Sequence, residues 1–125
     1  MNLKQEADQF LEERYGMSDF NSYQRSAAGT AIYPDQHKIT YPALGMAGEA
    51  GEVANKVKKL IRDGPDNRPD TWREDIASEI GDVLWYCAAL ASDLNLSLGM
   101  IAAQNLIKLD KRKDKGTLGG SGDTR

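Results

Sequence analysis

Residues 44–60 read LGMAGEAGEVANKVKKL, and this stretch decides the fold class. Apolar side chains recur in it three and four residues apart, which is the spacing of an amphipathic α-helix. Tyr41 and Pro42 come just before it and suit a helix start, because proline is tolerated in the first turn. We therefore expect a long helix from residue 41 or 42 to Asp63.

Helical patterns also cover most of the remaining chain. We expect helices over residues 3–15, over residues 20–33 with Ser18 or Asp19 as cap, from residue 70 or 71 to 93 or 94, and from Ser97 to Lys115. Thr71 and Glu74 have the spacing of a capping box, and Asn95 suits a left-handed helix end. Strand signals are nearly absent. The predicted fold class is therefore all-α, a helical bundle of about five helices.

The length of 125 residues allows one core and not two. We expect a single all-α domain over residues 1–115, followed by a glycine-rich tail over residues 116–125 that is extended or mobile. One cysteine and one histidine exclude an intramolecular disulfide, a CxxC zinc site and a histidine-rich metal site. We expect that cysteine, Cys87, to lie in the core.

The formal net charge of -3 lacks the basic excess typical of nucleic-acid-binding proteins, so a nucleic-acid partner is not expected. Residues 1–16 are too polar to contain the apolar core of a signal peptide. The longest apolar run, Val83–Ala91, is far shorter than the roughly 18 residues that cross a bilayer. We expect a cytoplasmic protein with no membrane partner.

Two pairs of carboxylates lie on the two longest predicted helices. Glu49 and Glu52 form one pair and Glu79 and Asp82 the other, each three residues apart and so on one helical face. Glu49 projects about 40° from Val53 within the apolar sector of its helix, with Glu52 at the edge. On the other helix Glu79 lies at the margin of the apolar sector, with Asp82 beyond it on the same side. Packing of the two helices would therefore bring the carboxylates together.

Carboxylates that meet in this way repel one another unless a cation compensates them. Oxygen ligands suit Mg²⁺, with Mn²⁺ as the alternative. The competing interpretation is that each pair is a solvated helix face. Gly45, Gly48 and Gly51 recur every third residue beside the first pair, which indicates either close helix packing or close access to the backbone.

On these residues the sequence resembles the MazG-like, all-α nucleoside triphosphate pyrophosphohydrolases. The family pattern is Glu-x-x-Glu, a spacer of variable length and then Glu-x-x-Asp, as in Glu49–Glu52 and Glu79–Asp82 here. The flanking residues 44–53 and 82–86 also look like that family, and the resemblance covers roughly residues 20–112. The ending GTLGGSGD at residues 116–123 looks like that of small stand-alone members, including phage-borne ones.

The resemblance implies a hydrolase acting on acid anhydrides. The reaction would be magnesium-dependent hydrolysis of nucleoside triphosphates, with deoxynucleotides favoured, to the monophosphate and pyrophosphate, for cleaning or balancing nucleotide pools. Glu49, Glu52, Glu79 and Asp82 would hold the metal, and either Glu52 or Glu49 would orient the attacking water. The resemblance also implies a homodimer or homotetramer, with the active site between the two long helices completed by oligomerisation.

Phosphate and base contacts are expected from other residues. Asn105, Lys108 and Arg112 share one stripe of the last helix, where the resemblance places phosphate contacts. Lys56 and Lys59 could serve similarly, although a solvated face is the favoured interpretation. Tyr86 follows Asp82 by four residues and is the preferred stacking partner for a base, whereas Trp85 would fill a subunit interface.

Two other functions compete with this one. The first is a non-enzymatic helical protein-interaction module, in which the carboxylates are surface groups. The second is a nucleic-acid-binding accessory protein that uses the basic residues 108–115, a reading weakened by Asp110 and Asp114 among them.

Overall fold

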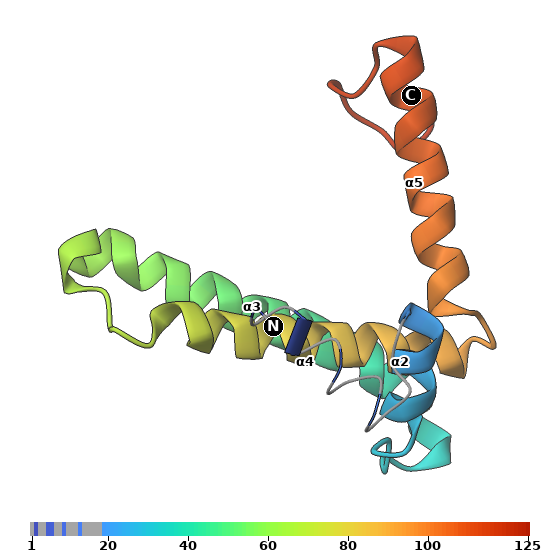
Figure 1. Cartoon of the computed structure of the whole chain (residues 1–125), viewed down its shortest axis with the longest axis horizontal. Helices are drawn as coiled ribbons and strands as arrows, with labels where there is room; N and C mark the ends of the chain where they lie inside the picture. The colour runs from blue at the N-terminus through green and yellow to red at the C-terminus, as the bar shows by residue number, and fades with distance from the viewer. Residues whose placement is uncertain (1, 3–4, 7–8, 10–12, 14–18) are drawn as a thin grey trace.

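The structure is a computed structural model that describes residues 2, 5–6, 9, 13 and 19–125. These residues form four α-helices and two short 3₁₀ helices, with no strand among them (Figure 1). The all-α prediction is confirmed. Most of the helix expected over residues 3–15 lies outside the described residues, which accounts for four helices where about five were expected.

The helix α2, Phe20–Ala28, begins at a capping aspartate and ends earlier than its sequence pattern indicates. Asp19 accepts a hydrogen bond from the backbone N–H of Ser22 at 2.7 Å, as expected of a cap. The prediction that this helix continues to Tyr33 is wrong. Gly29 ends it, and the Thr30 hydroxyl donates to the carbonyl of Ala27 at 2.9 Å, so that the chain leaves the helix axis there.

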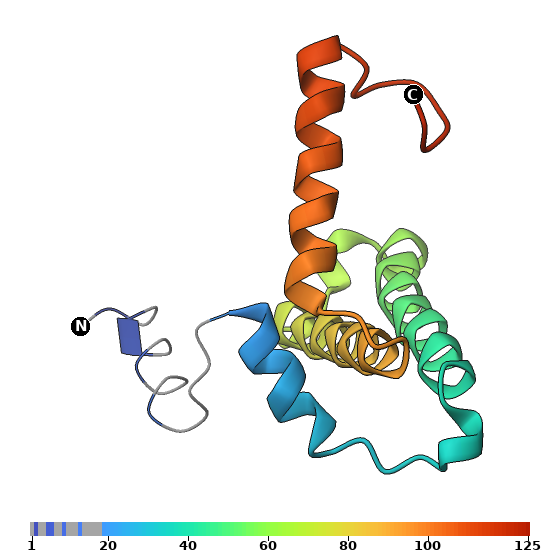
Figure 2. The same ribbon diagram turned by 90° about the vertical axis from the view of Figure 1, so that its right-hand side faces the viewer.

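The longest helices, α3 (Thr40–Asp63) and α4 (Trp72–Asp93), lie antiparallel and side by side in both views (Figures 1 and 2). The short turn η2, Pro65–Asn67, joins them after Gly64, whose φ of 88° suits glycine. The boundaries agree with the predicted ones. The Thr71–Glu74 capping box does not form, because the Thr71 hydroxyl donates to Asp75 instead, at 2.9 Å.

The packed core is small and lies where α2 crosses α4. Ala27, Ala88 and Leu98 are its buried members, and Tyr23, Trp85 and Cys87 pack against it half-buried. The prediction that Cys87 belongs to the core is confirmed. Most of the described large apolar side chains remain partly exposed, so the chain buries little of its apolar surface within one copy.

The last helix, α5 (Leu98–Lys115), leaves the end of α4 at 104° and projects away from the α3–α4 pair (Figures 1 and 2). Asn95 has a φ of 57° and Ser97 accepts a hydrogen bond from the N–H of Met100, so both predictions for this junction are confirmed. Contacts from α2 fix the direction of α5. Asn21 accepts from the N–H of Gly99 at 2.9 Å, and Gln24 accepts from that of Leu98 at 2.8 Å.

Among the described residues, no single helix has the length and apolar character needed to cross a membrane. Only the strongly bent pair of α4 and α5 meets that test, by length and composition alone.

Candidate active site

The α3–α4 interface brings together three of the four carboxylates singled out in the sequence. Glu49, Glu79 and Asp82 each offer one oxygen, and these oxygens all lie within 4.8 Å of one another. Glu49 and Glu79 are half-buried where the helices meet, whereas Asp82 is exposed. We call these three residues the carboxylate group. It forms because residues at the margins of two apolar sectors face each other once those sectors pack.

The fourth carboxylate, Glu52, is exposed and lies outside the carboxylate group. It is near enough for its charge to act on Glu49. The pKa of Glu49 is raised above its ordinary value of 4.5, first by the hydrogen-bonding contact with the Glu79 carboxyl, then by burial, and then by the charges of Asp82, Glu79 and Glu52. The site therefore holds an excess of negative charge that disfavours ionised Glu49.

One ammonium group faces this charge. The Nζ of Lys56 lies 3.4 Å from the Oε1 of Glu79, and only 29% and 17% of the two side chains is exposed. The expectation that Lys56 lies on a solvated face is wrong, because it lies one turn beyond Val53 on the face of α3 that packs against α4. Lys59 is exposed, as expected.

The donor set of the carboxylate group fits a hard divalent ion. All three donors are carboxylate oxygens, the ligands that Mg²⁺ takes from proteins at about 2.0–2.1 Å. The three oxygens lie within 4.8 Å of one another, so small side-chain movements would bring each of them to that distance from a single ion. The raised pKa of Glu49 supports the same fit, since a cation would relieve the repulsion that causes it.

A hollow of about 350 Å³ opens beside the carboxylate group. It is lined by Thr30, Glu49, Asp82, Trp85 and Tyr86. Flat aromatic surfaces next to a few polar groups are typical of ligand pockets. The structure therefore brings Tyr86 together with two of the carboxylates.

Packing behind the hollow fixes the orientation of its two aromatic walls. The Tyr86 ring lies against the backbone of Gly45, where a Cβ atom would collide with it, and meets Trp85 edge-on at 5.1 Å between ring centroids. The Trp85 indole N–H donates to the Thr30 hydroxyl at 2.8 Å. Burial is the main reason that the pKa of Tyr86 is raised. Of the regularly spaced glycines, Gly45 therefore serves close helix packing.

Thr30 is the site residue that sequence reasoning missed. The sequence pattern places it inside a helix that runs to Tyr33, and nothing in that pattern distinguishes its hydroxyl from other polar side chains of the helix. The glycine before it is the signal that could have shown a helix end.

The expected phosphate contacts lie elsewhere in the chain. Asn105, Lys108 and Arg112 are on α5, which projects away from the α3–α4 pair (Figure 1). At 1.5 Å per residue, about 16 Å of helix separates Asp82 from the end of α4, and about 15 Å more leads along α5 to Lys108. Since the two helices meet at 104°, the carboxylate group and Lys108 do not face one common hollow within one copy of the chain.

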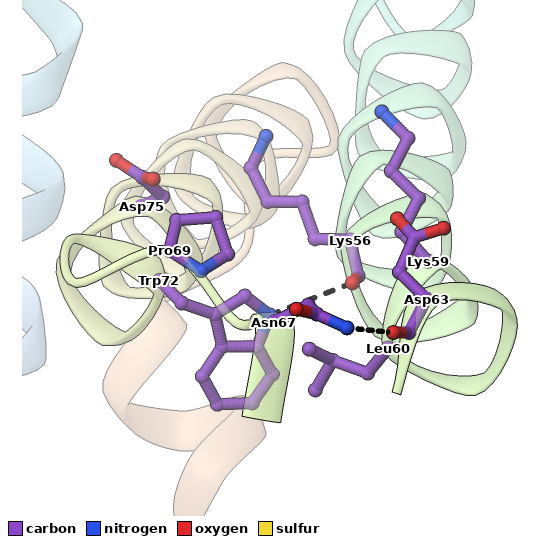
Figure 3. Close-up of a pocket in the computed structure, with 8 residues that line it drawn as sticks. All are labelled: Lys56, Lys59, Leu60, Asp63, Asn67, Pro69, Trp72 and Asp75. Atoms are coloured by element: carbon purple, nitrogen blue, oxygen red, sulfur yellow. Dashed lines mark hydrogen bonds between the residues drawn. The ribbon is translucent and has the colours of Figure 1, made fainter. Parts of the chain in front are cut away.

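A second hollow, of about 250 Å³, lies at the closed end of the α3–α4 pair (Figure 3). Its lining includes Trp72, Pro69 and Leu60 together with the ammonium groups of Lys56 and Lys59. The Trp72 indole N–H points to the carbonyl of Lys56 at 3.4 Å, which anchors the start of α4 to α3. Lys56 thus belongs to this hollow and to the charge balance of the carboxylate group.

Comparison with known proteins agrees with this geometry. The pattern that defines the MazG nucleotide pyrophosphohydrolase domain matches residues 37–117. The chain belongs to the MazG family. The match contains α3, α4 and α5, and so the whole carboxylate group.

One relative of this chain comes from Mycobacterium phage L5 and is named gene 37 protein. It is 45% identical over 109 residues, which are 82% of this chain and 96% of the relative. No solved structure matches the chain.

Proposed function

We propose that this protein hydrolyses nucleoside triphosphates to the monophosphate and pyrophosphate with the help of Mg²⁺. Membership of the MazG nucleotide pyrophosphohydrolase family supports the reaction class. The single observation that carries the proposal for this chain is the convergence of Glu49, Glu79 and Asp82 beside a hollow walled by Tyr86.

The residues divide the work in a way that suits phosphoanhydride hydrolysis. Glu49, Glu79 and Asp82 would hold the ion, with Mn²⁺ as an alternative to Mg²⁺. When bound, a divalent ion neutralises phosphate charge and polarises the phosphorus–oxygen bonds. Tyr86 and Trp85 would form the wall against which a base packs, and deoxynucleotides remain the favoured substrates.

Glu52 is the proposed water-orienting residue, because it lies beside the carboxylate group without belonging to it. Its carboxylate would accept a proton as a water oxygen attacks the α-phosphorus, and the bond from that phosphorus to the oxygen bridging the α- and β-phosphates breaks. Pyrophosphate then leaves with the electron pair of that bond. No serine or cysteine nucleophile is required.

We also propose that a homodimer or homotetramer is the working form. Lys108 and Arg112 are separated from the carboxylate group of their own chain, so α5 of a second copy would bring positive charge to the phosphates. The exposed apolar side chains of α5, among them Ile107 and Leu106 with 54% and 62% exposed, support such an association.

The direct test is to incubate the protein with Mg²⁺ and a panel of canonical and modified nucleoside triphosphates, and to quantify monophosphate and pyrophosphate by ion-exchange chromatography. Glu49→Gln and Glu79→Gln should lower turnover by at least about a hundredfold, because each removes a charge that holds the ion. Glu74→Gln is the matched control, since Glu74 is exposed on the same helix α4 and lies outside the carboxylate group.

Release of orthophosphate without pyrophosphate would contradict the proposal. So would full activity of both carboxylate variants. Absence of turnover on every nucleotide, together with no Mg²⁺-dependent rise in melting temperature, would favour the interaction-module alternative.

A further inference from the structure

The last ten residues, 116–125, are not extended, contrary to the expectation from their glycine content. They fold back against the end of α5 (Figures 1 and 2). Gly116 ends the helix in the left-handed region with a φ of 70°, and the Thr117 N–H donates to the carbonyl of Arg112 at 2.7 Å. We call residues 116–125 the tail loop.

A single side chain gathers the tail loop into a closed form. The guanidinium of Arg125 donates to the carbonyls of Thr117 at 3.2 Å, Gly119 at 3.1 Å and Leu118 at 3.2 Å, and also to that of Gly122. Five donors in a planar fork suit several convergent acceptors. The Arg125 side chain therefore holds the tail loop in one folded conformation by hydrogen bonds within the loop.

In this folded conformation the Asp123 carboxylate contacts two cationic side chains of α5. Asp123 accepts from the Nζ of Lys108 at 2.9 Å and from the Nη2 of Arg112 at 2.9 Å, both on its Oδ1. The same Nη2 also donates to the backbone carbonyl of Asp123 at 2.6 Å. Lys108 first, and Arg112 after it, hold the pKa of Asp123 below its usual range.

The Arg112 side chain is buried in this arrangement, and one of its hydrogen-bond donors is unpaired among the described residues. Only 7% of the residue is exposed, although it lies at the projecting end of a helix that few other elements touch (Figure 2). Its Nε is buried and has no hydrogen-bond partner among the residues that the structure describes. Asp123 thus accepts hydrogen bonds from one nitrogen, Nη2, of a guanidinium that could bind an anion through two nitrogens.

The surroundings are those of an anion site. A hollow of about 260 Å³ lies between α5 and the tail loop. Its lining includes the Asp123 carboxylate and five basic side chains, those of Lys108, Lys111, Arg112, Lys115 and Arg125. Asp123 itself is 78% exposed, so water competes for it and little energy opposes its release. A phosphate carries more charge than a carboxylate and presents more acceptor oxygens.

We propose that the tail loop is an autoinhibitory contact: Asp123 occupies Lys108 and Arg112, the cations to which the proposed function assigns the phosphates, and an arriving phosphate or pyrophosphate displaces the tail loop to bind them. The phosphate role of Lys108 and Arg112 rests on the proposed function. The displacement of Asp123 does not, because it is argued from the contacts of the tail loop.

The test is a calorimetric titration of the full chain with inorganic pyrophosphate in metal-free buffer. Asp123→Asn removes the competing charge and should tighten pyrophosphate binding about tenfold, a difference of about 1.4 kcal/mol. Asp110→Asn changes the net charge equally, but Asp110 lies outside the lining of the hollow, so binding should change far less. Lys108→Gln should weaken binding in both the parent and the Asp123→Asn background.

A second measurement reports the movement of the loop. Pyrophosphate should accelerate amide hydrogen exchange at residues 117–124, because the bound anion releases the tail loop. Equal or weaker binding by Asp123→Asn, or slower exchange in the presence of pyrophosphate, would overturn the proposal. Since neither experiment requires turnover, a protein that hydrolyses no nucleotide could still pass both, and an active enzyme could fail both.

Discussion

The ammonium of Lys56 lies 3.4 Å from a carboxylate oxygen of Glu79, one of the three acidic side chains that converge between α3 and α4. Both side chains are largely covered, so solvent and salt screen this pair less than a surface pair. Lys56 therefore offsets part of the repulsion within the carboxylate group, in the same place where a divalent ion would act.

Lys56→Gln should consequently destabilise the metal-free protein and increase its response to Mg²⁺. Loss of the partly covered pair should lower the free energy of unfolding by about 1 kcal/mol. Mg²⁺ should then raise the melting temperature of the variant more than that of the parent, because the ion meets less opposing charge. Thermal melts in chelator and across a Mg²⁺ titration measure both effects.

Lys59→Gln is the control for this comparison. It removes the same charge from the same helix, but Lys59 is exposed and forms no ion pair in the described part of the chain. Identical Mg²⁺ responses of the two variants would mean that Lys56 does not balance the carboxylate group.

Glu49→Gln should stabilise the protein in chelator near neutral pH, although it is expected to lower turnover by at least about a hundredfold. The pKa of Glu49 is raised in the folded state, chiefly by contact with Glu79, so folding favours its protonated form. Its contribution to stability is therefore present below the ordinary pKa of 4.5 and is lost as the pH rises through the raised value. Glutamine mimics the protonated side chain and escapes that loss.

Melting temperatures measured from pH 4 to pH 8 in chelator test this sign. The variant should melt above the parent at pH 7, and the two should converge toward pH 4. Glu74→Gln, on the exposed side of α4, should show no such convergence. A Glu49→Gln protein that is less stable than the parent at pH 7 would show that the carboxylate group is not strained by its own charge.

The sequence pattern predicted α3, α4, α5 and the meeting of Glu49 with Glu79 and Asp82, because all of these follow from local periodicity. The direction of α5 does not follow from local periodicity. It depends on Asn21 and Gln24 of α2, which cap a helix more than seventy residues further along the chain. No local pattern reports a contact of that separation.

The tail loop shows a different limit of sequence reasoning. Its glycines indicate flexibility when they are counted, yet Gly120 and Gly122 have φ values of 94° and 88° that the closed loop requires. Arg125 collects the backbone carbonyls of this loop, and such a contact cannot be read from residue types alone.

Gly45 and Gly48 should respond to alanine in opposite directions. A Cβ at Gly45 would collide with the Tyr86 ring, so Gly45→Ala should destabilise the protein by about 1–3 kcal/mol and distort the hollow beside the carboxylate group. At Gly48 a Cβ meets no described atom within 4 Å, so Gly48→Ala should stabilise α3 by about 1 kcal/mol. Denaturant unfolding of the two variants gives both values.

The same pair of variants separates the two interpretations of the regularly spaced glycines. Retained activity in Gly48→Ala would leave helix packing at Gly45 as the sole requirement. Loss of activity together with increased stability would indicate that substrate or a second copy approaches the backbone at Gly48.

Tyr33→Phe should destabilise the protein below pH 10 and lose that effect toward pH 12. The Tyr33 hydroxyl donates to Asp93 at 2.8 Å, and burial, followed by this hydrogen bond, raises the pKa of Tyr33 from 10.0 to about 12. The folded state thus favours the protonated phenol. Its contribution is complete below pH 10 and disappears as the pH rises through about 12.

The same aspartate accepts a hydrogen bond from the backbone N–H of Ile39 at 2.9 Å and so holds the start of α3, where Ile39 has a φ of 69° that is rare for a β-branched residue.

A hydrogen bond to a charged acceptor contributes about 1.5 kcal/mol to the free energy of unfolding, and we expect that loss in Tyr33→Phe at pH 8. Denaturant unfolding at intervals up to pH 12 should show the parent and the variant converging. Asp93→Asn should bring the titration of the Tyr33 phenol, followed by ultraviolet absorbance, back toward pH 10. A difference that is constant across this range would mean that the Tyr33 hydroxyl does not stabilise the fold through Asp93.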